Sequence, residues 1–283
     1  MKKKIQIILL IVLVTVMATS IFYLISYYKK TNKDNEIFKN LEQVGTNKNE
    51  LENSFFEDDS ELSNNVENNQ TNVGSSNRQN STLRNKTASY SSLDLKSLKI
   101  KNGDTEGWIK IDNTKINYPV MQNGDFYLHN NFYKKYSISG TPYLASYCNI
   151  NSSDNLIIYG HHMSSGSMFA GLDIYKTYKG YKNHKYIRFY TLSGNTTIEN
   201  KYEVIGAYKV QPNTEVANIL YGTIKFKSEE DFNKYAKILK DKSLYNTDAN
   251  FSYGDKFITL STCEYSQKNG RLVVVGKKIL YNY

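Results

Sequence analysis

The compact part of this sequence predicts a mostly β fold, either a barrel or a sandwich, preceded by a membrane-spanning helix. Short β-branched and tyrosine-rich runs recur between residues 90 and 283, bounded by Gly, Asn, Asp and Ser. Many strands with few helices argue against a doubly wound sheet. An uncharged apolar run over residues 5–28 predicts the membrane-spanning helix.

The apolar run is long enough to cross a membrane. Three lysines precede it at residues 2–4, and two follow it at residues 29–30. As a helix the run would reach about 36 Å, against a hydrocarbon core of about 30 Å. A cleaved signal peptide is the alternative, but its apolar part is usually about 7–15 residues and ends in a small-x-small site. We therefore expect residues 1–30 to form a cytoplasmic tip and an uncleaved anchor, with the rest of the chain outside.

Residues 31–89 are predicted to form an extracellular stalk, partly helical and then flexible. Apolar residues recur at helical spacing over residues 36–56, with a break expected at residues 45–47. From residue 57 onward Asn, Ser, Glu, Asp and Thr dominate, and such a segment cannot bury enough surface to offset its ordering entropy. The compact domain then spans residues 90–283.

Within the compact domain, the sequence predicts seven strands and one helix. The helix covers residues 228–242, because Ser228 can cap it, acidic residues fill its first turn, and apolar residues recur at helical spacing. The strands are predicted at residues 108–111, 118–121, 156–159, 186–190, 202–210, 257–261 and 272–277.

Charge and motif content exclude several classes of function. The net charge of +9 is spread without a run of five cations, which fits an anionic membrane or wall surface. No aromatic–basic signature indicates a nucleic-acid partner. The chain has no CxxC and no HExxH motif, and the adjacent His161 and His162 cannot easily ligate one ion. We therefore expect no metal and no cofactor.

Three residues at the ends of predicted strands could carry cysteine chemistry. Cys263 follows one apolar run, Arg271 opens the next, and His161 follows the run at residues 156–158. A cysteine acts as a nucleophile only as its thiolate, which a nearby imidazolium or guanidinium favours. Each residue also has an ordinary structural explanation, and Cys263 could instead be buried or form a disulfide with Cys148, so the residues alone leave these alternatives open.

The motifs around these residues resemble those of the sortases, and specifically class B. "TLSTC" followed by an arginine, and "IYGHHM" upstream, carry the resemblance, together with "GWIKIDNTKINYPVMQ", "DFYLHNNFYKKYSISG" and "GSMFAGL". The likeness covers residues 93–278, with the motifs in the expected order. It implies a closed β-barrel of eight strands with a few peripheral helices.

The resemblance also implies the roles of the site residues. Cys263 would attack the scissile carbonyl and form a thioacyl enzyme, His161 would transfer protons, and Arg271 would bind the substrate backbone and stabilise the oxyanion. His162 does not match the catalytic position. Four further residues are expected to line the substrate groove: Asn117, Ser261, Thr262 and Glu264.

A class B sortase would be a single-pass protein of a Gram-positive cell membrane, with its catalytic domain outside. It would cleave an NPxTx-like C-terminal sorting signal after Thr in surface proteins, and transfer them to an amine of a peptidoglycan precursor. Two other functions stay open from the sequence. One is a cysteine peptidase that passes the acyl group to water. The other is a membrane-tethered binding domain with a Cys148–Cys263 disulfide.

Overall fold

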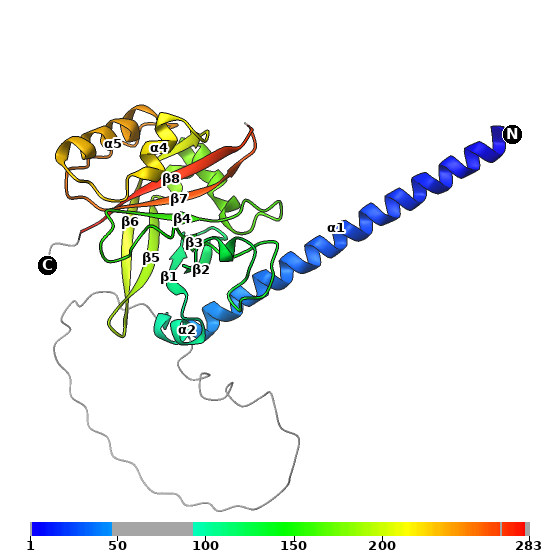
Figure 1. Cartoon of the computed structure of the whole chain (residues 1–283), viewed down its shortest axis with the longest axis horizontal. Coiled ribbons are helices and arrows are strands. Elements are labelled where there is room, and N and C mark those ends of the chain that lie inside the picture. The colour runs from blue at the N-terminus through cyan, green and yellow to red at the C-terminus, as the bar shows by residue number, and fades with distance from the viewer. Residues whose placement is uncertain (1, 47–92, 267, 281–283) are drawn as a thin grey trace, which may run out of the picture.

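The computed structural model describes residues 2–46, 93–266 and 268–280, and its centre is a closed β-barrel (Figure 1). Eight strands form the barrel in the order β1-β2-β3-β4-β7-β8-β6-β5, and β5 pairs with β1 to close it. Their bounds are β1 Thr105–Lys110, β2 Asn117–Met121, β3 Tyr143–Leu144, β4 Asn155–Tyr159, β5 Tyr186–Ser193, β6 Thr196–Val210, β7 Phe257–Glu264 and β8 Gly270–Lys278. The closed eight-stranded barrel is confirmed, and the sandwich is excluded.

All seven predicted strands are present, and the structure adds the two-residue strand β3. A segment this short has no period-2 pattern that a sequence could reveal. It forms because Tyr143 pairs with Met121 of β2 and with Tyr159 of β4. Strand β3 therefore closes the gap between the first two strands and the rest of the barrel.

Two helices lie over the outside of β6 and β8 (Figure 1). They are α4 (Glu215–Gly222) and α5 (Glu229–Asp241), and the second confirms the predicted helix. The Ser228 hydroxyl caps α5 by accepting from the backbone N–H of Asp231 at 3.2 Å. Shorter helices occur at α2 (Leu95–Lys101), η1 (Phe126–Leu128), η2 (Phe169–Lys176) and α3 (Tyr178–Asn183).

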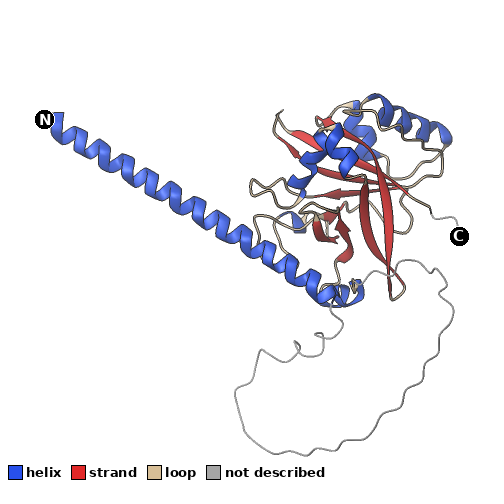
Figure 2. Cartoon of the chain, turned by 180° about the vertical axis from the view of Figure 1, so that it is seen from behind, coloured by secondary structure: helices blue, strands red, loops and turns tan. Residues whose placement is uncertain are grey.

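Helix α1 (Lys2–Thr46) runs without interruption away from the barrel, as Figures 1 and 2 show. It is long and apolar enough to cross a membrane, with a mean hydropathy of 2.7 in its most apolar 18-residue window. The helix passes through residue 30, where we placed the end of the anchor, because no Gly or Pro occurs before Gly45. Residues 47–89, the remainder of the predicted stalk, lie outside the described residues.

The second half of α1 packs against the barrel. The Ser137 hydroxyl donates to the buried Asp34 carboxylate at 2.5 Å, and the Phe38 ring meets the Tyr118 ring edge-on at 5.2 Å between centroids. Leu41 is fully buried, and the end of α1 contacts α2. Residues 31–41 are therefore part of the folded domain.

Candidate active site

The parallel pair β4–β7 brings two predicted site residues to one end of the barrel. Tyr159 and Ser261 are the last paired residues, and His161 and Cys263 each follow two positions later. The Thr262 hydroxyl donates to the Gly160 carbonyl at 2.8 Å, so the chain leaving β4 stays beside β7. Because the carboxyl ends of neighbouring parallel strands meet at the same edge, His161 lies beside the strand that carries Cys263.

Gly160 is needed because an aromatic ring lies against its backbone. A Cβ atom at this position would lie 2.6 Å from the Phe169 ring. The aromatic ring packs directly on the backbone before His161, which only glycine permits. This contact fixes the position of His161 at the end of the barrel.

Cys263 and Arg271 face each other across the antiparallel pair β7–β8. Directly opposed residues carry their side chains on the same face, with Cβ atoms about 4.5–5.5 Å apart. The hairpin turn between them contains Asn269, whose φ of 57° lies in the left-handed region that Asn tolerates. The Arg271 guanidinium folds toward this turn, because its Nη1 donates to the carbonyls of Asn269 (2.9 Å) and Gly270 (3.0 Å).

His161 is oriented by a backbone carbonyl. Its Nε2 lies 2.8 Å from the Leu128 carbonyl oxygen, which can only accept. The neutral ring therefore carries its proton on Nε2 and leaves Nδ1 as an acceptor. Burial lowers the pKa of His161, with a further contribution from His129, whose ring centroid is 5.7 Å away; the Leu128 contact acts in the opposite direction.

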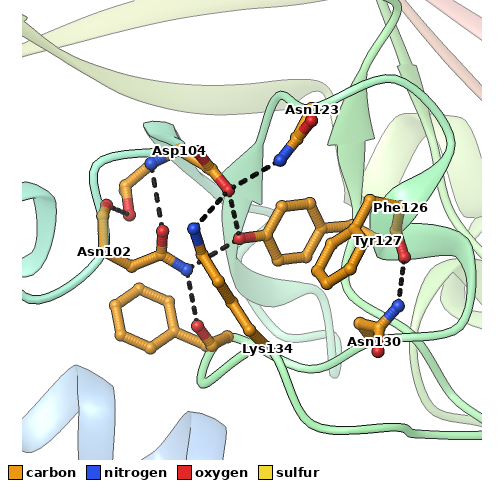
Figure 3. A network of polar contacts seen from close by, with 9 residues as sticks. Asn102, Asp104, Asn123, Phe126, Tyr127, Asn130 and Lys134 are labelled. Atoms are coloured by element: carbon orange, nitrogen blue, oxygen red, sulfur yellow. Dashed lines mark hydrogen bonds and ion pairs between the residues drawn. The ribbon is translucent and has the colours of Figure 1, made fainter.

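A polar network holds the segment that presents the Leu128 carbonyl (Figure 3). Asp104 accepts from the Tyr127 hydroxyl at 2.9 Å and pairs with the Lys134 ammonium at 3.0 Å. Asn102 donates to the Tyr127 hydroxyl at 2.7 Å and to the Phe132 carbonyl at 2.6 Å. The loop around η1 is thus tied to the start of β1, and it can hold His161 in a fixed orientation.

Three of the four residues predicted to line the substrate groove lie next to Cys263. Ser261, Thr262 and Glu264 are all buried. The Ser261 hydroxyl bonds to the Tyr221 hydroxyl at 2.8 Å, while Thr262 makes the bond to Gly160. Both hydroxyls are therefore engaged by protein partners beside Cys263.

Glu264 has structural partners on two neighbouring elements. Its carboxylate lies 3.4 Å from the Lys176 ammonium of η2 and 3.5 Å from the Lys209 ammonium of β6. It also accepts from the Ser266 hydroxyl at 2.6 Å. Burial opposes ionisation, but Ser266 and the two lysines outweigh it and lower the pKa of Glu264. The ionised carboxylate fastens the end of β7 beside Cys263.

The Asn117 side chain is engaged by other partners. Its side-chain oxygen accepts from the Trp108 indole N–H at 2.7 Å, and the residue lines a hollow against α1.

His162 turns toward Asp173, with Nε2 at 3.0 Å from the carboxylate. Cys148 is a free buried thiol beside the start of β4, and Cys263 is also a free thiol.

A groove of about 600 Å³ opens beside Arg271. Its walls include Tyr147, Tyr159, Tyr221 and Ile224. The Tyr159 and Tyr221 rings stack at 6.1 Å, and burial raises the pKa of Tyr221 to about 12, so that its hydroxyl stays neutral. This size suits a short peptide segment or a small ligand.

Sequence reasoning missed the aromatic walls and the Leu128 carbonyl. Tyr159 stood within the quoted "IYGHHM" motif, where its place before the histidine was a usable signal. Tyr147 and Tyr221 lie in loops and helices far apart in sequence, and only the fold brings them together. A backbone oxygen carries no residue-type signal at all.

A closed barrel that brings a cysteine, a histidine and an arginine to one end has the groups of a cysteine enzyme that transfers acyl groups. The sortase domain family matches residues 109–279 of the chain. Sortase B of Staphylococcus aureus is 34% identical over 196 residues, 65% of this chain and 74% of that protein. Sortase B of Listeria monocytogenes is 34% identical over 192 residues, 66% of this chain and 74% of that protein.

Solved structures give the same family. Sortase B of Clostridium perfringens superposes with a TM-score of 0.59 at 35% identity, covering 65% of this chain and 99% of that one. A Staphylococcus aureus sortase B–substrate complex gives a TM-score of 0.59 at 32% identity, covering 66% of this chain and 85% of that one. The chain belongs to the sortase family, and within it to class B.

Proposed function

We propose that this sortase uses Cys263 to cleave an NPxTx-like sorting signal after Thr, and transfers the acyl group to an amine of a peptidoglycan precursor. The observation that carries the proposal is the direct opposition of Cys263 and Arg271 across β7–β8, beside the strand end that leads to His161. A thiol nucleophile, a proton-transfer group and a fixed cation are the parts that acyl transfer through a thioester needs.

The proton steps follow from the tautomer of His161. As the Cys263 sulfur attacks the scissile carbonyl, the thiol proton passes to Nδ1. The tetrahedral intermediate then collapses, the C–N bond breaks, and the imidazolium returns the proton to the leaving amine. In the second half, the nitrogen of the incoming amine attacks the thioester carbonyl and gives a proton to Nδ1. The C–S bond then breaks, and the imidazolium returns that proton to the Cys263 sulfur.

Arg271 would stabilise the oxyanion of each tetrahedral intermediate. Two carbonyls of the hairpin turn already hold Nη1 and fix the plane of the guanidinium. The remaining N–H groups can donate to negative charge that develops only in the transition state. The groove walled by Tyr147, Tyr159 and Tyr221 would receive the peptide beside this cation.

Relatives supply support for both substrates. Staphylococcus aureus sortase B has been solved in complex with substrate, and a sortase B structure has been solved with triglycine, a peptide that carries a free amine. For location, the apolar part of α1 would anchor the enzyme in the cell membrane, with the barrel on the outer face of a Gram-positive cell.

The test is acylation of the full chain in detergent by an NPxTx peptide, followed by intact mass. We expect the wild type to gain the mass of the acyl fragment and Cys263→Ala to gain nothing. Cys148→Ala is the matched control, because it removes the other thiol while leaving Cys263 in place, and it should acylate like the wild type. Added triglycine should divert the product from the free acid to the triglycine adduct. Acylation of Cys263→Ala would overturn the assignment.

A further inference from the structure

Helix α1 begins to touch the barrel at the residue where its apolar run ends. Residues 3–26 are all exposed, and the positions that turn toward the barrel are Tyr27, Thr31, Asp34, Phe38 and Leu41. Their spacing of four and three residues is that of one continuous helix face. No spacer therefore separates the apolar run from the folded domain.

The first contacts along α1 are with loops next to the active site. Tyr27 bonds to the Ser164 hydroxyl at 3.1 Å, three residues after His161, and the Lys30 ammonium lies 4.7 Å above the Tyr136 ring. Further along the helix, Glu42 meets Lys110 at 3.3 Å. From Tyr27 to Glu42 the helix rises about 22 Å, so the loops near His161 are the part of the barrel nearest the apolar run.

These loops expose aromatic and cationic side chains together. Tyr136 is 64% exposed and Tyr265 is 72% exposed. Both flank the site, since Tyr265 packs edge-on against His162 and Tyr136 stacks on His129, the neighbour of His161. Tyr133, Lys134 and Lys135 are exposed in the same loop as Tyr136. We call Tyr133, Lys134, Lys135, Tyr136 and Tyr265 the rim. Tyrosine favours the boundary between hydrocarbon and water, and lysine favours anionic headgroups.

We propose that the rim rests in the headgroup layer of an anionic membrane, so that the active site opens at the membrane surface. The inference rests on the proposed anchoring of α1. The rim is continuous with the apolar run through Tyr27 and Lys30, and the exposed ammonium groups of Lys30 and Lys135 complement anionic lipid. The enzyme would then meet acyl donors and amine acceptors that are themselves held at the membrane, rather than ones in free solution.

The test is fluorescence quenching by brominated phospholipids in vesicles that contain anionic lipid and the full chain. Tyr136→Trp and Tyr265→Trp each place a reporter on the rim. Tyr253→Trp is the matched control, because Tyr253 is 50% exposed and precedes the start of β7, at the opposite end of that strand from Cys263. Trp108 is buried and contributes the same background to all three variants.

We expect strong loss of emission at both rim positions, greater for lipids brominated near the headgroup than for deep-brominated lipids, and none at Tyr253→Trp. Two rim positions keep the test open if one variant does not fold. If the protein floats with the vesicles but the rim and control tryptophans lose emission equally, the inference is overturned. The proposed chemistry and the anchor would then stay intact. A chain that fails to float with the vesicles would overturn the anchor as well.

Discussion

His161 has a single basic atom because the Leu128 carbonyl occupies the other ring nitrogen. Burial, with His129 nearby, lowers the pKa of the ring in the folded state. The unfolded chain therefore holds this proton more tightly, with a pKa of about 6.5. The neutral ring therefore contributes its full stabilisation above the pKa of the unfolded chain. That contribution is lost as the pH falls through the lower pKa of the folded protein.

We expect the His161 ring to titrate below about 6.5 and to carry its proton on Nε2 when neutral. Nitrogen-15 NMR of labelled histidine in a Cys263→Ala background measures both properties, because removal of the thiol uncouples the two titrations. His129→Gln should raise the midpoint, and His184→Gln should leave it unchanged, since His184 lies in the α3 region against Gly180. A neutral ring protonated on Nδ1 would contradict the assignment.

At the scale of elements, the groove wall on α4 is fastened to the beginning of β4. The Asn155 amide donates to the Thr223 carbonyl at 3.1 Å, and its oxygen accepts from the Thr259 hydroxyl at 2.8 Å. These bonds join the end of α4 to β7, and α4 carries Tyr221. One buried side chain thereby sets the distance between the groove wall and the strand of the nucleophile.

Asn155→Ala should loosen this wall without touching the reacting groups. We expect KM for the sorting peptide to rise several-fold with kcat little changed, and the free energy of unfolding to fall by about 1–3 kcal/mol. Asn200→Ala is the matched control, since Asn200 is a buried amide that bonds Phe189 and Thr191 of β5 and does not line the groove. It should lose similar stability at unchanged KM. A KM shift shared by both variants would refute a specific role for Asn155.

The strands that form the barrel were predictable where an apolar or alternating run was long enough to leave a pattern. Strand β3 and helix α4 were not, because a two-residue pairing and an eight-residue helix depend on their neighbours more than on local sequence. Cys263, Arg271 and His161 stood out through motif resemblance, and the pairing of β7 with β4 and β8 now places them together. Asn117 shared that motif signal, yet it packs against Trp108, because a motif records order along the chain and not the direction of a side chain.

For the whole molecule, α1 is both an apolar rod and a structural part of the catalytic domain. Phe38 and Leu41 are almost fully buried against the barrel, whereas the apolar side chains before Tyr27 are all exposed. The domain therefore derives part of its stability from the helix that would hold it at the membrane.

Replacing Phe38 and Leu41 together by alanine should destabilise the full chain in detergent. Burial of each side chain contributes about 1.5–3 kcal/mol, so we expect the free energy of unfolding to fall by about 3–6 kcal/mol. Denaturation followed by circular dichroism measures the change. Lys33→Ala, at an exposed position of the same helix, should unfold like the wild type. If the double variant also matched the wild type, α1 would not stabilise the barrel.

Closure of the barrel limits how a peptide can be recognised. Proteins with an open sheet edge can capture an extended ligand as one more strand, through its main-chain N–H and C=O groups and with little regard to sequence. Here β5 pairs with β1, and β4 pairs with β7 up to Ser261, so these ladders are already occupied within the protein. Discrimination is left to side-chain shape in the tyrosine-lined groove, as the proposed cleavage of one short sorting signal requires.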